Sequence, residues 1–287
     1  MTFSGTFLLC LSALLLGASG AGLAEKSGIV IGFAVEGIML LGGLAGILAS
    51  RLSPAAALLL AGCAGLLFSM LLMILSQRGR GDQILGGMGL TLMAAALAMI
   101  LARLLGGVSY NRKAFEFMLN GEPLPVFFPA ALLLWFLCWL LLRFTRLGGR
   151  IQLCGENRKA AENMGIHTRF IQMISAMAGG FLCGIGGLSA LVFLGSGWSV
   201  KLGAGGLGFL ALSVMILGRG KPLLNLLVSV LFAAAEACAV FFADSWPGIP
   251  QEAFRMIPFL IALVLLAFFH HSQSIPRETA RNLGLDE

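Results

Sequence analysis

Long runs of apolar residues, separated by short polar stretches, constrain this chain more than any other feature. Hydrophobic residues make up 59% of its 287 positions and charged residues only 11%, whereas soluble domains carry roughly 25% charged residues. A chain this apolar cannot cover a soluble surface, so it needs lipid around it. Backbone groups in lipid find partners only within their own helix, and we therefore expect each run to be helical. The runs cover residues 7–23, 28–50, 54–75, 84–102, 126–142, 170–194, 206–217, 223–242 and 257–269.

The expected fold is all-α, a polytopic membrane bundle of about nine transmembrane helices, each needing roughly 20 residues. The loops are too short for a second core, so we expect residues 1–287 to form a single transmembrane domain. The run at 206–217 is short for a full span, and we expect it to begin near Leu202 or to be a broken helix. Residues 6–16 resemble a signal peptide, but no basic residue precedes them, which favours a retained first helix.

The distribution of basic residues predicts the orientation in the membrane. With nine spans, 13 of the 19 Lys and Arg residues fall on one side, which the positive-inside rule makes cytoplasmic. The N-terminus is then outside, and a loop at 143–169 and a tail at 271–287 are cytoplasmic. The net charge of +6 does not indicate nucleic-acid binding, because the basic residues form no patch with interleaved aromatics. The 13 residues are Lys26, Arg78, Arg80, Arg143, Arg146, Arg150, Arg158, Lys159, Arg169, Arg219, Lys221, Arg277 and Arg281.

Several motifs have a plain structural explanation. Residues 203–208 fit G-x-G-x-x-G, but that fingerprint binds dinucleotides only between a strand and a helix. Residues 218–221, Gly-Arg-Gly-Lys, resemble the end of a phosphate-binding loop. However, Met215 stands where such a loop has its first glycine, and Pro222 stands where it has Ser or Thr. The six cysteines show no disulfide or metal spacing, and His270 and His271 fit a headgroup-level position without a metal. Two G-x-x-x-G pairs, Gly42/Gly46 and Gly180/Gly184, favour close helix packing within the chain over a subunit interface.

The longest polar loop contains a predicted short helix. Asn157 can cap its start, and Gly165 can end it as a left-handed C′ residue. The helix presents small apolar residues on a loop that has no obvious core to cover, which suggests docking onto a partner. A functionless connector is the alternative. The apolar residues are Ala160, Ala161, Met164 and Ile166.

This loop resembles the coupling-helix loop of binding-protein-dependent ABC permeases, in the branched-chain amino acid-like family that serves simple sugars and nucleosides. The matching residues are Gly155-Glu156-Asn157, Ala160-Ala161 and Gly165-Ile166, with Arg158 and Met164 between them. The glycine-rich stretch at 176–188 and the segments at 25–40 and 206–222 are similar to nucleoside-type permeases. Ile31-Gly32 and Lys221 depart from that pattern.

The resemblance implies a permease fold unlike that of type I importers, in the inner membrane of a bacterium. The chain would translocate a small neutral solute, with nucleosides first and simple sugars as the alternative. It would perform no chemistry and need no cofactor, because ATP and Mg would bind a partner ATPase, commonly with two fused nucleotide-binding domains. A second, related permease and an extracytoplasmic binding lipoprotein would complete the transporter. An ion-coupled secondary transporter is the rival of another class, but no paired acidic or basic relay supports it.

Two carboxylates lie well inside apolar runs, Glu36 and Glu236. An ionisable group within the membrane is costly, so each is a candidate for the substrate pathway, with a structural strut between helices as the alternative. The two readings are evenly balanced for Glu36, and the strut is favoured for Glu236. Trp198 could stack on a base or sugar at the outer mouth, but anchoring at the membrane interface is favoured, because Trp prefers that depth.

Overall fold

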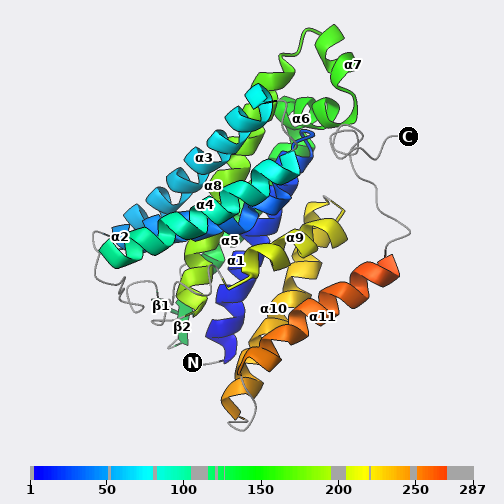
Figure 1. Cartoon of the computed structure of the whole chain (residues 1–287). Coiled ribbons are helices and arrows are strands. Elements are labelled where there is room, and N and C mark those ends of the chain that lie inside the picture. The colour runs from blue at the N-terminus through cyan, green and yellow to red at the C-terminus, as the bar shows by residue number, and fades with distance from the viewer. Residues whose placement is uncertain are drawn as a thin grey trace.

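The computed structural model describes residues 3–50, 53–79, 83–104, 116–119, 122–125, 127–194, 205–219, 221–245 and 251–269. These residues form a bundle of tilted helices (Figure 1). The long helices are α1 (Phe3–Glu25), α3 (Pro54–Gly79), α4 (Gln83–Leu104), α5 (Phe127–Phe144), α8 (Thr168–Leu194), α10 (Pro222–Ser245) and α11 (Gln251–Phe269). The shorter elements are η1 (Gly32–Ala34), α2 (Val35–Ala49), α6 (Arg146–Glu156), α7 (Arg158–Asn163), α9 (Leu207–Leu217) and the strands β1 (Glu116–Leu119) and β2 (Glu122–Pro125).

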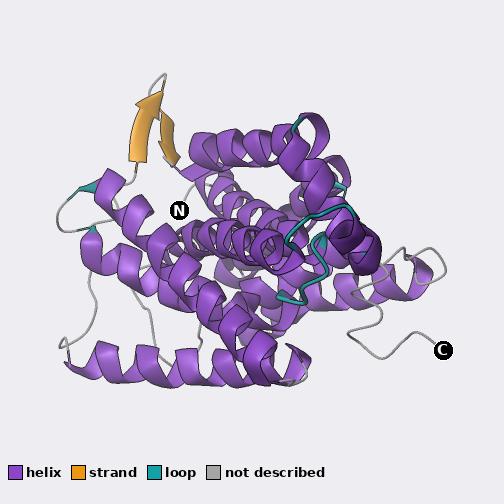
Figure 2. Cartoon of the chain, turned by 90° about the horizontal axis from the view of Figure 1, so that it is seen from above, coloured by secondary structure: helices purple, strands orange, loops and turns teal. Residues whose placement is uncertain are grey.

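Every predicted apolar run coincides with a helix, so the prediction of a polytopic helical bundle is confirmed. Within the described residues, seven helical segments are long and apolar enough to cross a membrane, and two further apolar helices are shorter. The expected count of nine full crossings is therefore not confirmed. The antiparallel pair β1–β2 was not predicted, and it lies at the edge of the bundle (Figure 2).

The core of the bundle is built on α8, which packs against α1, α2 and α3. Glycines make this close approach possible. A Cβ on Gly20 would meet the carbonyl oxygen of Gly179, and a Cβ on Gly42 would meet the backbone of Gly184. The predicted G-x-x-x-G pairs thus pack within the chain. Because apolar groups are equally at home in lipid, such backbone proximity, rather than water exclusion, holds these helices together.

Polar contacts fix the register between α1 and α8. The Ser175 hydroxyl donates to the Leu23 carbonyl over 2.6 Å, and the Gln172 amide donates to the Ser27 carbonyl over 3.0 Å. The start of α8 therefore lies beside the end of α1, and the two helices run antiparallel. As a result, α1 begins at the end of the bundle opposite α7 (Figure 1).

The outer face of the bundle is apolar. Large side chains on α3, α4, α5, α10 and α11 are exposed, whereas α1, η1–α2 and α8 are mostly buried. Lipid tails are the natural neighbours of such a surface, because helices pair most of their backbone groups internally. Representative exposed side chains are Leu67, Leu92, Leu133, Leu227 and Phe268.

Candidate functional site

Two short helices follow α5, and we call residues 145–168 the coupling segment. Thr145 caps α6 by accepting the Gly148 N–H over 3.1 Å. Ile151 and Cys154 are buried, and burial raises the pKa of the Cys154 thiol. Sequence reasoning missed α6 because Gly148 and Gly149 lower helix propensity in its first turn. The spacing of Leu147, Ile151 and Cys154 at i, i+4 and i+7 was the available signal.

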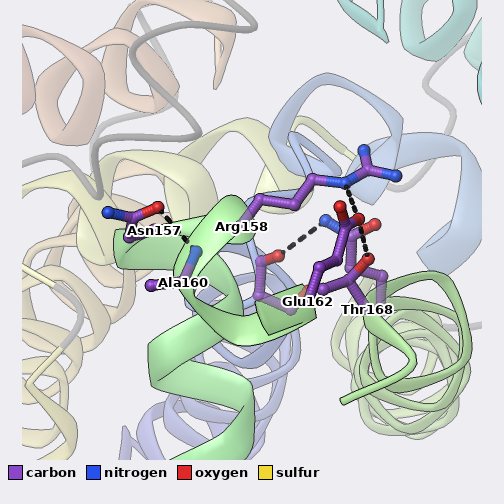
Figure 3. A network of polar contacts seen from close by, with 7 residues as sticks. Asn157, Arg158, Ala160, Glu162 and Thr168 are labelled. Carbon is purple, nitrogen blue, oxygen red and sulfur yellow. Dashed lines mark hydrogen bonds and ion pairs between the residues drawn. The ribbon is translucent and has the colours of Figure 1, made fainter. Parts of the chain in front are cut away.

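The start of α7 matches the prediction. Asn157 adopts an extended backbone, and its side-chain oxygen accepts the Ala160 N–H over 3.1 Å. Behind it, Arg158 pairs with Glu162 over 3.0 Å, and the Thr168 hydroxyl donates to the same carboxylate oxygen over 2.9 Å (Figure 3). The hydrogen bonds from Arg158 and Thr168 hold the pKa of Glu162 below its usual value. One carboxylate thus joins α7 to the first residue of α8.

The end of α7 also matches the prediction. Gly165 has φ +75°, the left-handed conformation that glycine adopts without a Cβ penalty. Its N–H donates to the Glu162 carbonyl, and the Ile166 N–H donates to the Ala161 carbonyl over 3.0 Å. These two bonds form a Schellman motif, which satisfies the last carbonyls of the helix.

Gly155 anchors the coupling segment to the bundle. A Cβ at this position would meet the carbonyl oxygen of Lys26 and the backbone of Gly28. Only glycine therefore lets α6 lie directly on the turn that follows α1. Desolvation in this contact region lowers the pKa of Lys26. The first residue of the Gly155-Glu156-Asn157 match is thus a packing position within the chain.

The expectation of one free apolar face on α7 is wrong. Ala161 is fully buried, and it packs with Ile166, Ile151 and Cys154 in a cluster shared with α5 and α8. Helix α6, which the sequence did not predict, supplies apolar side chains that cover Ala161. Met164 remains outside at 70% exposure, Ala160 is half-buried, and Glu156 is exposed. The surface available to a partner is therefore Met164 with the polar residues around it.

Glu36 lies at the N-terminus of the short helix α9. Its carboxylate oxygens accept the N–H of Gly208 over 2.8 Å and of Gly206 over 3.3 Å. Gly205 and Gly206 have φ +72° and +80°, so this turn requires glycine. With 11 residues, α9 spans only about 16 Å; it begins at Leu207 rather than near Leu202, and the alternative of a broken helix concerns residues 195–204, which lie outside the described residues. Gly206 and Gly208 of the glycine motif thus donate to a carboxyl group of the same chain.

Of the other pathway candidates, Glu236 lies within the described residues. Glu236 is buried on α10. Trp198, His270, His271 and the tail at 271–287 lie outside the described residues.

The turn between α9 and α10 was not singled out as a packing site by sequence. Arg219 has φ +51°, an uncommon conformation for a residue with a Cβ. The indole N–H of Trp135 on α5 donates to the Pro222 carbonyl over 3.0 Å. The hydrogen bond holds the start of α10 against the helix that leads into the coupling segment.

Known proteins resemble this chain over nearly its whole length. Residues 4–266 match the family model described as branched-chain amino acid transport system/permease component. The chain is 28% identical to the nucleoside ABC transporter permease protein NupC of Lactococcus lactis, covering 96% of this chain and 94% of the relative. It is 28% identical to the guanosine ABC transporter permease protein NupQ of Bacillus subtilis, covering 92% and 90%.

Among solved structures, the chain resembles a metal-chelate type ABC transporter in an inward-facing conformation. The TM-score is 0.49 with 19% identity, over 91% of this chain and 85% of that one. The family model spans nearly all of the apolar helices and the coupling segment between them. The chain belongs to the branched-chain amino acid transport system/permease component family, and it is a multi-pass permease of the inner membrane.

Proposed function

We propose that this chain is the membrane-spanning subunit of an ATP-driven importer whose cargo is nucleosides. The observation that carries the proposal is the likeness to NupC and NupQ over nearly the whole length of all three chains. The apolar bundle supports a solute without net charge, because charge inside the membrane is costly. Simple sugars, which also carry no charge, are the comparison cargo in the test.

The proposed partners follow from the permease family. A separate ATPase, with two fused nucleotide-binding domains, binds ATP and Mg and performs the hydrolysis. A second, related permease completes the membrane part, and an extracytoplasmic lipoprotein delivers the solute. In this arrangement the coupling segment is cytoplasmic and the N-terminus is outside. The excess of basic residues on the coupling-segment side supports that orientation.

Uptake measurements test the cargo. Cells that lack this chain but keep the other subunits are expected to lose ATP-dependent uptake of labelled nucleosides and to regain it when the gene is restored. Unlabelled nucleosides compete in this assay, and ribose and galactose do not. Loss of sugar uptake with nucleoside uptake intact would instead assign the chain to sugars.

The ATPase contact is proposed to centre on Met164. This side chain projects from a helix whose two ends are fixed by Asn157 and Gly165, so its position is well defined. Because an exposed apolar side chain on a polar loop suits a partner's apolar cleft, burying Met164 there would contribute about 1.5–3 kcal/mol. Glu156 and Arg158 would make polar contacts around it.

A matched pair of variants tests this contact. Met164→Glu is expected to leave protein levels unchanged, because the side chain is exposed, while reducing both co-purification of the ATPase and uptake at least tenfold. Met164→Leu keeps the apolar contact and is the control, with near-normal uptake. If Met164→Glu transports as the wild type does, α7 is a passive connector.

A further inference from the structure

One face of α5 points away from the bundle and ends in an arginine. Phe136, Trp139, Leu140 and Arg143 follow one another at intervals of one to four residues that return to this side of the helix. Phe136 and Leu140 are 49% and 38% exposed, and Arg143 is exposed as well. The residues of α5 that are buried against the bundle lie on a different face, and they are Phe127, Ala131, Trp135, Cys138 and Leu142.

Aromatic rings surround the side chain of Arg143. Its guanidinium carbon lies 5.8 Å from the ring centroid of Trp139 and 5.9 Å from that of Phe144, which is the range of a cation–π contact. The Trp139 ring also packs on Phe136 and on Phe144, with centroids 5.6 and 5.7 Å apart. These four side chains form one continuous group, which we call the aromatic–arginine cluster.

The charge of this cluster is not neutralised within the described part of the chain. Arg143 forms no ion pair with another described residue. Residues 127–155, all of them described, contain two further arginines, Arg146 and Arg150, and no carboxylate. Contacts with rings leave the N–H donors of a guanidinium without an oxygen partner, and its planar fork matches the oxygens of a phosphate. The cluster therefore offers donors and positive charge to an anion.

The cluster adjoins the corner where α5 turns into α6. A Cβ on Gly148 would meet the carbonyl oxygen of Leu141 and the backbone of Leu142. The Gln152 side-chain amide donates to the Leu142 carbonyl over 3.0 Å. Helix α6 is thus seated on the last turn of α5, the turn that also carries Arg143. A ligand that holds Arg143 in place would steady this corner.

The position of the cluster favours a lipid over an acidic partner protein as the source of the anion. Residues 127–144 form a helix long and apolar enough to cross a membrane, so acyl chains are the neighbours of Phe136 and Leu140. Trp and Arg near the end of such a helix lie at headgroup depth. A simple interfacial anchor accepts any phospholipid, whereas uncompensated positive charge selects an anionic one.

We propose that the aromatic–arginine cluster binds an anionic phospholipid, and that the bound lipid steadies the α5–α6 corner from which the coupling segment begins. Arg143 binds the phosphate, and Phe136, Trp139 and Leu140 contact the acyl chains. The lipid belongs to the leaflet on the side of the coupling segment. The proposal rests on the proposed function only for the role of that segment, because binding of the lipid does not depend on the cargo.

Native mass spectrometry of the complete, purified transporter tests the binding. Phosphatidylglycerol is expected to stay bound at a concentration at which phosphatidylcholine does not. Arg143→Ala should weaken this binding about fivefold. Arg103→Ala is the matched control and leaves the binding unchanged, because Arg103 is also exposed at the end of a membrane helix, but no ring contact involves it among the described residues. Glycerol 3-phosphate should not compete, since it has no acyl chains.

Three results of this experiment would overturn the lipid site. Equal binding of the two lipids, or equal binding by the wild type and Arg143→Ala, would leave only an interfacial anchor. Displacement by glycerol 3-phosphate would identify the ligand as a soluble phosphate. Loss of ATPase co-purification from Arg143→Ala in phosphatidylcholine alone would assign the arginine to the partner protein.

Hydrogen exchange in nanodiscs tests the effect on the corner. The α6 amides of the wild type should exchange severalfold more slowly in phosphatidylglycerol than in phosphatidylcholine, because a ligand that binds only the ordered corner stabilises it. Arg143→Ala should abolish the difference, while the amides of α8 exchange equally in both lipids. Exchange of α6 that is the same in both lipids for the wild type would overturn the role assigned to the lipid.

The lipid site and the proposed function fail in different ways. If the wild-type transporter imports no nucleoside but still binds phosphatidylglycerol through Arg143, the nucleoside assignment is overturned and the lipid site stands. If nucleoside uptake is normal and phosphatidylglycerol is not selected, the proposed function stands and the lipid site is overturned.

Discussion

Glu36 and Glu236 are both buried in the membrane bundle, but the hydrogen bonding of their carboxyl groups differs. Glu36 accepts two backbone N–H groups from α9, and it also faces the partial positive charge of that helix terminus. Glu236 has one oxygen without a partner among the described residues. Burial alone therefore does not distinguish a structural carboxylate from one available to a ligand. The difference lies in whether the protein itself supplies the donors.

Removing the Glu36 carboxylate gives the largest expected effect on stability. Glu36→Leu leaves the N–H groups of Gly206 and Gly208 unpaired in an apolar environment, at a cost of about 2–5 kcal/mol. The melting temperature of the purified protein in detergent should fall accordingly. Glu236→Leu is the matched control, and it should be neutral or stabilising because it removes an unpaired oxygen. Equal losses from both substitutions would contradict the distinction drawn here.

Substituting Gly206 tests the N-terminus of α9 by changing its turn rather than its carboxyl partner. Gly206→Ala places a Cβ on a residue with φ +80° and 2.9 Å from the ring of Phe259. Strain and overpacking together should lower the unfolding free energy by about 2–4 kcal/mol. Gly89→Ala on α4 is the control, because a Cβ there meets nothing within 4 Å. A stable Gly206→Ala protein would mean that α9 does not need this turn.

Gly165 offers a comparison outside the lipid, with a smaller effect. Gly165→Ala introduces the same kind of strain, since φ is +75°, but a Cβ there meets nothing within 4 Å. The expected cost is about 1–2 kcal/mol, confined to α7. Hydrogen exchange of the α7 amides should accelerate while the melting temperature of the bundle stays constant. Gly165→Asn should lose less, because asparagine tolerates the left-handed region.

Glu162 is an exposed carboxylate, and protonating it is expected to have the smallest effect on stability. Its folded-state pKa is lowered by hydrogen bonds from Arg158 and Thr168. The contribution to α7 stability is therefore complete above the unfolded pKa of a glutamate, and it is lost as the pH falls through the folded pKa. Hydrogen exchange of α7, corrected for intrinsic rates, should accelerate on acidification below that range. A Glu162→Gln variant should show no such dependence on pH.

Local signals in the sequence predicted the membrane helices and both ends of α7. The apolar runs, Asn157 and Gly165 act through bonds to near neighbours, so their roles could be inferred directly. The burial of Ala161 could not be inferred, because it depends on α6, which two adjacent glycines concealed. The role of Glu36 was equally hidden, since its partners lie 170 and 172 residues away in the chain. Contacts of this length depend on how the helices pack, and no local pattern records them.

The length of α8 has a mechanical consequence. Its 27 residues make a rod about 40 Å long, longer than the roughly 30 Å hydrocarbon layer. Thr168, its first residue, is hydrogen-bonded to α7 through Glu162. A tilt of about 5° around one end would displace the other end of such a rod by about 3.5 Å. A small rotation imposed on α7 would thus be delivered across the whole membrane as a displacement comparable to the width of a water molecule.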